Sequence, residues 1–501
     1  MIAVRAGIAV LLLSVFPLVA LAEEHGGKPG ERSGQGGPGV LSLLPSDSVT
    51  EHAIDTPAGK LSYTATAGTF ALFDQSGERS AAIFYTAFVA KTNDKGGDPA
   101  RPVTFVFNGG PGAGSAFLNL GLVGPRIAVF GAGFDGAHVR LTDNPDTWLG
   151  FTDLVLIDPV GTGWSRAAKP DGGEAFWNIR RDAESLAKVI ALYVAKNGRV
   201  SSPKYILGES YGGFRAAKVA QALQSSQGII ANGIVMVSPM IEGQFQFGGD
   251  RFALGAALAL PSLAAAELER KGTFSPAALA QAERFAMTDY LTTLAGPPPT
   301  GDAARAFYGE VAQITGLPED VIARERGFIR DAYVKNLRRA DRKIVSHYDV
   351  TFAVADPNPE SASARGPDPF LDGFIRAYGS AFVSYARDEL GFKTEMTYNL
   401  LAAEVSNKWD WDDGGHAPAS AADDLRQLLA LTPSFRLLIA HGYSDLVTPY
   451  SNSRYVLNHI PPNVEGERAD LKLYRGGHMF YTDPQSRKAF TNDARAMYAS
   501  P

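Results

Sequence analysis

Five short apolar runs restrict the fold of this chain more than any other feature of its sequence. They are rich in β-branched residues, most are followed closely by Gly, Asp or Ser, and they occupy residues 102–107, 153–157, 204–207, 234–237 and 436–440. Such runs suit parallel strands that are buried on both faces. Ala-rich stretches with helical spacing, such as 178–196 and 214–224, lie between several of them. The pattern predicts an α/β fold with a mostly parallel central sheet.

Two other regions differ from this series. Residues 60–90 contain alternating runs of Thr, Tyr, Phe and Ala, which predict antiparallel strands at an edge of the sheet. Between 243 and 399 helix signals dominate, for instance the N-cap and first-turn pair Ser275-Pro276. We expect 243–399 to be a helical cap insertion that shapes a substrate pocket, between core segments 46–242 and 400–501.

The composition indicates a large globular protein and argues against some partners. Hydrophobic residues make up 45% of the chain and charged residues 20%, enough for an extensive core. The 47 basic and 53 acidic side chains include no dense basic run, so we expect no nucleic-acid partner. The count of Cys is 0, which excludes disulfides and a catalytic thiol.

The N-terminus has the pattern of an export signal. Arg5 precedes an apolar run at 7–21, and Ala20-Leu21-Ala22 forms a small-x-small cleavage signature, so we expect a signal peptide at 1–22. The alternative is a membrane anchor, but the run is short and contains Pro17. We expect a flexible Gly-rich leader at 23–45, a periplasmic or secreted location, and no stable membrane insertion after cleavage.

The segment Gly208-Glu209-Ser210-Tyr211-Gly212 fits the G-x-S-x-G pattern of a nucleophilic serine. It follows the run KYIL directly and precedes the helix-like FRAAKVAQALQ. A sharp strand-to-helix turn exposes the serine hydroxyl, and small glycines let strand and helix approach. A serine in an ordinary Gly-rich turn is the alternative. The flanking elements favour Ser210 as the nucleophile.

A nucleophilic serine needs a base and an acid that orients the base, in the chain order Ser, acid, His on this fold. His478 follows the strand-like run LKLYRGG, and Asp445 follows the run RLLIA, so both belong on loops at strand ends. We predict the triad Ser210, Asp445 and His478. The rival base is His441, and the rival acids are Asp470 and Asp483.

The oxyanion hole is predicted in the segment 108–112 (NGGPG), which follows the run PVTFVF and offers backbone N–H groups at a strand end. We expect the N–H groups of Gly110 and Tyr211 to be the donors. A phosphate-binding loop is excluded, because Pro111 removes a donor and no Lys-Ser/Thr pair follows.

A separate aromatic and acidic stretch, NKWDWDD (407–413), either lines the pocket or forms a packed aromatic pair beside an acidic turn.

Four ordered blocks together resemble the serine carboxypeptidase family of α/β hydrolases. They are NGGPG (108–112), DPVGTGWS (158–165), GESYGG (208–213) and GGHM (476–479). The resemblance implies an α/β-hydrolase fold and removal of residues from peptide C-termini, usually under acidic conditions. It also implies that Asn108 and Glu209 bind the terminal carboxylate of the substrate.

The chain departs from the family pattern around this carboxylate site. The resemblance implies a second Glu, sharing a proton with the first, but Leu122 stands there. Val106 replaces a Trp and Ala113 replaces a Cys. Because Glu209 lacks the second acid that would raise its pKa, we expect activity at less acidic pH, unless burial raises that pKa instead.

Three functions remain open at this stage. The first is a serine-type carboxypeptidase that acts on peptides through an acyl-enzyme on Ser210. The second is an exported esterase or acyltransferase with the same triad, and the third is a binding protein that has lost catalysis. A serine triad needs no cofactor, and no His/Cys cluster has metal-ligand spacing, so we expect neither a cofactor nor a metal. The sequence indicates no oligomeric state.

Overall fold

The computed structural model describes residues 39–91, 98–131, 134–246, 252–412 and 419–499. The predicted signal peptide and most of the predicted leader therefore lie outside the described residues. At the end of the leader, Val40–Leu43 form a 3-10 helix. Within the described part of the chain, no helix combines the length and apolar character needed to cross a membrane.

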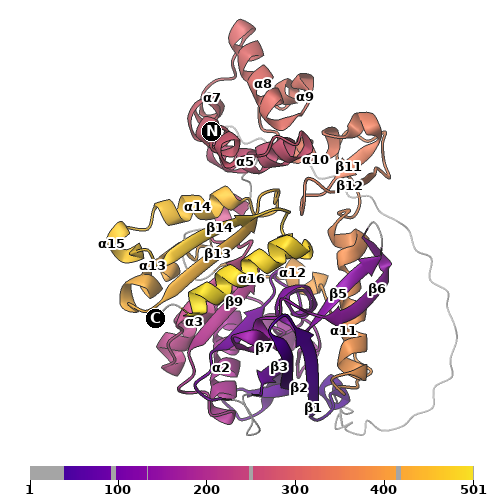
Figure 1. The fold of residues 1–501 in the computed structure, drawn as a ribbon, viewed down its shortest axis with the longest axis vertical. Coiled ribbons are helices and arrows are strands. Elements are labelled where there is room, and N and C mark those ends of the chain that lie inside the picture. Colours follow the sequence, from indigo (N-terminus) through magenta and orange to yellow (C-terminus); the bar gives the residue numbers. More distant parts are fainter. Residues whose placement is uncertain (1–38, 92–97, 132–133, 247–251, 413–418, 500–501) are drawn as a thin grey trace, which may run out of the picture. The chain divides into compact units, whose positions relative to one another are not determined.

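A large sheet organises the molecule (Figure 1), with the order β1-β2-β3-β7-β4-β9-β10-β13-β14 and the short β8 paired to β3. The antiparallel end consists of β1 (Ser48–Thr56), β2 (Gly59–Phe73), β3 (Arg79–Ala90) and β8 (Arg166–Ala167). The remaining strands run parallel to one another: β4 (Val103–Phe107), β7 (Asp153–Ile157), β9 (Lys204–Glu209), β10 (Gly233–Val237), β13 (Arg436–Gly442) and β14 (Ala469–Tyr474).

Five of the parallel strands, β4, β7, β9, β10 and β13, are buried on both faces, as their composition predicts. Along β4, Phe105 and Phe107 enter one hydrophobic cluster while Val106 enters another on the opposite face. The first cluster also contains residues of α2 (Ile179–Lys196), α3 (Tyr211–Ala222) and α13 (Ala422–Leu431). The second contains residues of α11 (Ala377–Asp388) and α16 (Pro484–Ala499). The predicted α/β-hydrolase fold, with helices on both faces of the sheet, is confirmed.

The region predicted as a cap, 243–399, contributes residues to three hydrophobic clusters. A separate cluster contains residues of α5, α6, α8, α9 and α10, and Figure 1 shows α5 and α7 to α10 grouped together. Their bounds are α5 (Ala253–Arg270), α6 (Pro276–Phe285), α7 (Leu291–Ala295), α8 (Gly301–Thr315), α9 (Glu319–Arg324) and α10 (Arg330–Asn336). The later helix α11 packs on the sheet instead. Two short strands that the sequence pattern does not indicate, β11 (Lys343–Val345) and β12 (Ala353–Ala355), pair within this region.

Segments of the region predicted as a cap hold the loops that follow β13 and β14. Arg330 donates hydrogen bonds to the carbonyls of Leu446 and Val447, and the N–H of Val350 donates to the carbonyl of Ser444. The N–H of His478 donates to the carbonyl of Tyr348 at 2.6 Å. The insertion thus contacts both loops on which the sequence predicts catalytic residues.

A second hairpin, β5 (Arg126–Gly131) with β6 (Asp135–Asp143), lies outside the main sheet. Helix α14 (Tyr450–Asn458) follows the loop after β13.

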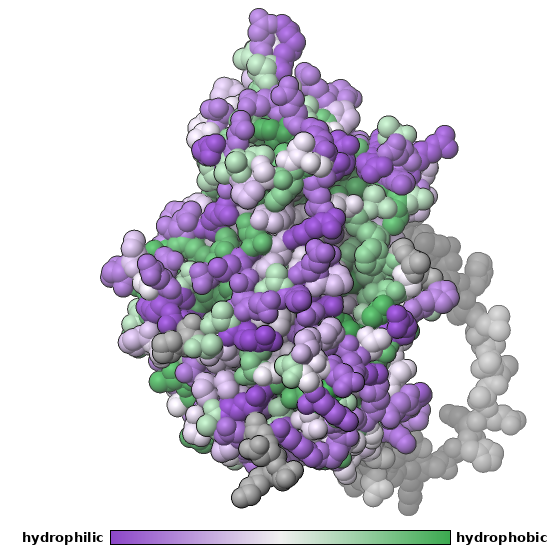
Figure 2. All heavy atoms as spheres, in the orientation of Figure 1, coloured by the Kyte–Doolittle hydropathy of each residue, from purple (hydrophilic) through white to green (hydrophobic). Residues whose placement is uncertain are grey.

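The space-filling view shows hydrophilic residues spread over most of the visible face, with smaller hydrophobic areas between them (Figure 2).

Candidate active site

Ser210 occupies the sharp turn between β9 and α3, with backbone angles φ 60° and ψ −125°. This is an unfavourable conformation for a residue with a side chain, and its N–H is held by a hydrogen bond to the carbonyl of Val237 at 2.9 Å. The turn requires its glycines, because a Cβ on Gly208 would lie 1.9 Å from the carbonyl oxygen of Gly212. The strained turn places Ser210 on the wall of a pocket.

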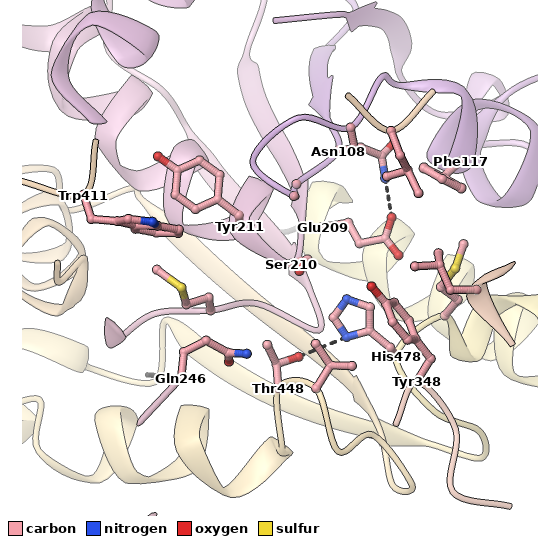
Figure 3. A pocket seen from close by; sticks show the side chains of 18 residues that line it. Asn108, Phe117, Glu209, Ser210, Tyr211, Gln246, Tyr348, Trp411, Thr448 and His478 are labelled. Carbon is pink, nitrogen blue, oxygen red and sulfur yellow. Dashed lines mark hydrogen bonds between the residues drawn. The ribbon is translucent and has the colours of Figure 1, made fainter. Parts of the chain in front are cut away.

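His478 and Asp445 lie together at the ends of neighbouring strands. The distance from His478 Nδ1 to Asp445 Oδ2 is 2.9 Å, and both side chains are buried. The other oxygen of Asp445 accepts the N–H groups of Val447 and Thr448. Figure 3 shows the His478 ring pointing toward Ser210. The structure therefore brings the three predicted triad residues to one place.

The rival residues lie elsewhere. The ring Nε2 of His441 is 2.8 Å from the hydroxyl of Ser453, and burial lowers the pKa of His441 to about 4. Asp470 is exposed on β14. Asp483 accepts the N–H of Ser486 at the start of α16. None of these three residues lines the pocket of Ser210.

Burial and two side chains determine the pKa of His478. Burial lowers its pKa, but the charge and hydrogen bond of Asp445, together with the charge of Glu209, outweigh burial. The pKa of His478 is therefore raised above its ordinary value. Thr448 Oγ1 adds a polar contact on this side, 2.8 Å from Asp445 Oδ2 and 3.1 Å from His478 Nδ1. Asp445 can thus hold the imidazole by its Nδ1, so that Nε2 faces Ser210.

The predicted oxyanion donors border the same pocket. Tyr211 is the first residue of α3, where an N–H has no acceptor one turn earlier in the helix. Gly110 lies in the turn after β4 with φ 101°. Between them Gly109 packs so tightly that a Cβ there would lie 2.7 Å from the Tyr211 nitrogen and 2.9 Å from Ser210 Cβ. The turn after β4 therefore lies directly against the nucleophile.

Asn108 and Glu209 form a buried hydrogen-bonded pair beside this centre (Figure 3). The amide Nδ2 of Asn108 donates to Glu209 Oε2, and the hydroxyl of Tyr481 donates to Glu209 Oε1 at 2.8 Å. Asn108 Oδ1 accepts the N–H of Leu118, which fixes the orientation of the amide. Both Asn108 and Glu209 line the pocket of Ser210.

Burial is the main influence on the pKa of Glu209 and raises it to about 7. The charge of His478 and the hydrogen bonds from Tyr481 and Asn108 lower the pKa, whereas the charge of Asp445 raises it. The sequence leaves open whether burial would replace a second carboxylate in raising this pKa. In the structure burial does so, and Glu209 can carry a proton near neutral pH.

The pocket has a volume of about 200 Å³. Its wall combines apolar and aromatic side chains with the polar groups already described, and includes Phe117, Met240, Gln246, Tyr348 and Trp411. Figure 3 shows Trp411, Tyr211 and Gln246 on one side of Ser210, and Asn108, Phe117 and Glu209 on the other. For the stretch 407–413 the sequence left open whether its aromatic residues line the pocket or pack together. In the structure Trp411 lines the pocket, and Trp409 is buried against Tyr211.

A family model matches part of the chain. Residues 62–248 match the family model for serine carboxypeptidase. The matched segment contains Ser210 and the turns after β4 and β9, but it ends before Asp445 and His478. The match supports a hydrolase. No curated protein matches the chain.

Solved structures align with the chain at low sequence identity. A prohormone-processing carboxypeptidase from Saccharomyces cerevisiae, Kex1Δp, aligns with a TM-score of 0.56 at 16% identity, over 92% of this chain and 95% of that one. A proline iminopeptidase from Mycobacterium smegmatis aligns with a TM-score of 0.38 at 15% identity, over 86% and 97%. An esterase from Thermogutta terrifontis aligns with a TM-score of 0.36 at 12% identity, over 90% and 100%.

The block DPVGTGWS, which carries part of the carboxypeptidase resemblance, supports the segment that follows the NGGPG turn. Asp158 is buried and accepts both the N–H and the hydroxyl of Ser115, each at 2.7 Å. A Cβ on Gly163 would lie 1.6 Å from Asp158 Oδ2. Ser115 follows the NGGPG turn closely, so Asp158 fixes the chain that leaves this turn.

Two polar groups of the site escape sequence reasoning. Tyr481 contacts Glu209, and Thr448 contacts both Asp445 and His478. Thr448 lies three residues after Asp445, and Tyr481 lies three residues after His478. Their closeness in sequence to the predicted triad residues could have indicated a role. However, no motif distinguishes these hydroxyls from others in the same loops.

Proposed function

We propose that this chain is a serine-type carboxypeptidase that hydrolyses the C-terminal bond of peptides through an acyl-enzyme on Ser210. The observation that carries the proposal is the buried Asn108–Glu209 pair in the pocket of Ser210. An acid whose pKa is about 7 donates a hydrogen bond to a carboxylate when it is protonated. The pair would therefore hold the free C-terminus of a peptide beside the nucleophile.

In the proposed reaction the three triad residues act in turn. Ser210 Oγ attacks the carbonyl carbon of the last peptide bond while His478 Nε2 takes its proton, and Asp445 stabilises the imidazolium. The N–H groups of Gly110 and Tyr211 stabilise the oxyanion, each worth about 2.7 to 4 kcal/mol. His478 then gives the proton to the leaving nitrogen, and the C–N bond breaks.

The second half of the reaction restores the enzyme. The released amino acid leaves the Glu209 side of the pocket, and water attacks the ester carbonyl while His478 accepts a proton from it. His478 returns this proton to Ser210 Oγ as the ester bond breaks. The peptide, one residue shorter, then leaves.

Product analysis by mass spectrometry tests the function. Wild type and Ser210→Ala are incubated at pH 5 to 8 with matched peptides that carry a free or an amidated C-terminus. Loss of single residues from the free peptides, at a rate well above that for amidated ones and absent in the variant, would support the proposal. Equal cleavage of both forms would contradict the role of Asn108 and Glu209.

The alternative function is an esterase or acyltransferase with the same triad. It is favoured by the buried apolar side chain of Leu122 at the position where the resemblance implies a second acid. Turnover of small esters together with inert free peptides would select this alternative.

We also propose that the chain is exported, after removal of residues 1–22, to the periplasm or outside the cell. The support is the apolar run followed by Ala20-Leu21-Ala22. N-terminal sequencing of the protein recovered from each cell fraction tests this, and a cytoplasmic protein that retains Met1 would contradict it.

A further inference from the structure

The buried carboxyl of Glu209 has a hydrogen-bond partner that lies outside the motifs. Tyr481 belongs to the short helix η11 (Phe480–Thr482), is fully buried, and donates its hydroxyl to Glu209 Oε1 at 2.8 Å. Burial and the charge of Glu209 raise the pKa of Tyr481 above its ordinary value, so the hydroxyl keeps its proton. Tyr481 is thus a neutral donor to the acid.

Tyr481 also packs against the segment that lacks the second acid. The π-helix η3 (Asn119–Val123) contains Leu122, and a Cβ on the adjacent Gly121 would lie 2.7 Å from Tyr481 Cε2. Gly121 thus leaves room for the aromatic ring. The ring reaches Glu209 from the C-terminal part of the chain, beside the segment from which a second carboxyl group would come.

The two partners of Glu209 differ in what they can do. The amide of Asn108 is fixed by the N–H of Leu118, so it presents to Glu209 an NH₂ group, which donates and cannot accept. The hydroxyl of Tyr481 can do either. It donates to an ionised Glu209 and, after rotation, accepts from a protonated one. Tyr481 is therefore the partner that can respond when the proton arrives or leaves.

The other titratable groups around Glu209 come from several elements. His478 and Asp445 lie on the loops after β14 and β13, and both act on the charge of Glu209. Tyr348 of the cap and Tyr378 of α11 are raised in pKa by burial, and both also feel the charge of Glu209. The charge of Arg487, on α16, lowers the pKa of Tyr378. Of these residues and Tyr481, only Tyr481 is hydrogen-bonded to the Glu209 carboxyl.

We propose that Tyr481 is a positioning residue that takes the place of the missing second carboxylic acid as a hydrogen-bond partner of Glu209 in both protonation states, and so sets the pH range in which the enzyme accepts a free C-terminus. This inference rests on the proposed function for its effect on turnover. Its structural part, the coupling of Tyr481 to the proton of Glu209, can be measured without any substrate.

Tyr481→Phe removes the hydroxyl and keeps the ring. A donor stabilises the ionised carboxylate more than the neutral acid, so its loss raises the pKa of Glu209, by about one unit. Because a free C-terminus needs protonated Glu209, the descending limb of the kcat/KM profile moves to higher pH by the same amount. At pH 8 the variant then has about fivefold higher kcat/KM than wild type on a peptide with a free C-terminus.

The controls separate this effect from simple damage. Tyr333→Phe changes a buried cap tyrosine whose hydroxyl has no hydrogen-bond partner within the described residues, and its profile stays that of wild type. In Tyr481→Phe, turnover of an uncharged ester and labelling of Ser210 by a serine-reactive phosphonate lack the shift of the descending limb to higher pH, because neither reaction needs protonated Glu209. An unchanged descending limb, or equal losses on ester and peptide at every pH, would overturn the proposal.

Difference infrared spectroscopy supplies the substrate-free measurement. The band of a protonated carboxyl that disappears in Glu209→Gln reports the proton of Glu209 directly, and its midpoint is expected to rise in Tyr481→Phe. If Tyr481→Phe does not fold, 3-fluorotyrosine at position 481, a stronger donor, lowers this midpoint instead. A midpoint insensitive to position 481 refutes the inference, whereas a shifted midpoint in an enzyme that cleaves no peptide refutes only the proposed function.

Discussion

The pH dependence of stability offers a direct test of the buried acid. In the folded chain burial raises the pKa of Glu209 to about 7, against an ordinary value of 4.5 that applies after unfolding. The unfolded state therefore releases the proton first, and folding loses stability as the pH rises from about 4.5 to about 7. The loss amounts to about 1 kcal/mol at pH 5 and reaches about 3 kcal/mol at pH 8.

Glu209→Gln keeps the shape of the protonated acid and removes the titration. Relative to wild type, the variant is expected to gain about 2 kcal/mol in its free energy of unfolding when the pH is raised from 5 to 8. Urea unfolding of both proteins, followed by circular dichroism at each pH, measures this difference, and constant effects of the substitution cancel in the comparison. A stability difference that is the same at pH 5 and pH 8 would refute the argument that Glu209 titrates near 7.

Further substitutions test the arrangement around the nucleophile. Asp445→Asn leaves His478 in the wrong tautomer, and steady-state assays should show kcat reduced about 10⁴-fold with little change in KM. Thr448→Val removes one hydrogen bond beside Asp445 and His478 and should lower kcat about fivefold. Unchanged turnover would show that Thr448 does not support the triad. Gly109→Ala places a Cβ 2.7 Å from the Tyr211 nitrogen and should lower kcat at least 100-fold, while normal turnover would contradict the predicted oxyanion hole.

The central elements of the fold could be predicted because burial on both faces leaves a clear mark on the sequence. Five apolar runs predict β4, β7, β9, β10 and β13, and all five form parallel strands of the main sheet. The alternating region 60–90 correctly predicts the antiparallel strands β2 and β3. Strand β1 was not predicted, because most of its residues are only partly buried or exposed and so carry little periodic signal.

The sequence predicts those residues of the candidate site that lie in motifs at strand ends, and it does not predict the others. Ser210, His478 and Asp445 follow strands that the sequence identifies, and the sheet brings them together. The contact between Tyr481 and Glu209 depends instead on how the loop after β14 packs against η3, which no local pattern encodes. The burial of Glu209, which decides its pKa, likewise arises from segments distant in the sequence.

The mass of the enzyme during turnover reveals whether an acyl-enzyme forms on Ser210. A depsipeptide whose last bond is an ester to a 2-hydroxy acid with a free carboxylate acylates quickly, so that the intermediate accumulates and survives an acid quench. We predict a mass increase equal to the mass of the substrate minus that of the released 2-hydroxy acid, located on the fragment that contains Ser210 and absent in Ser210→Ala. Turnover without this adduct, or an adduct on another residue, would contradict it.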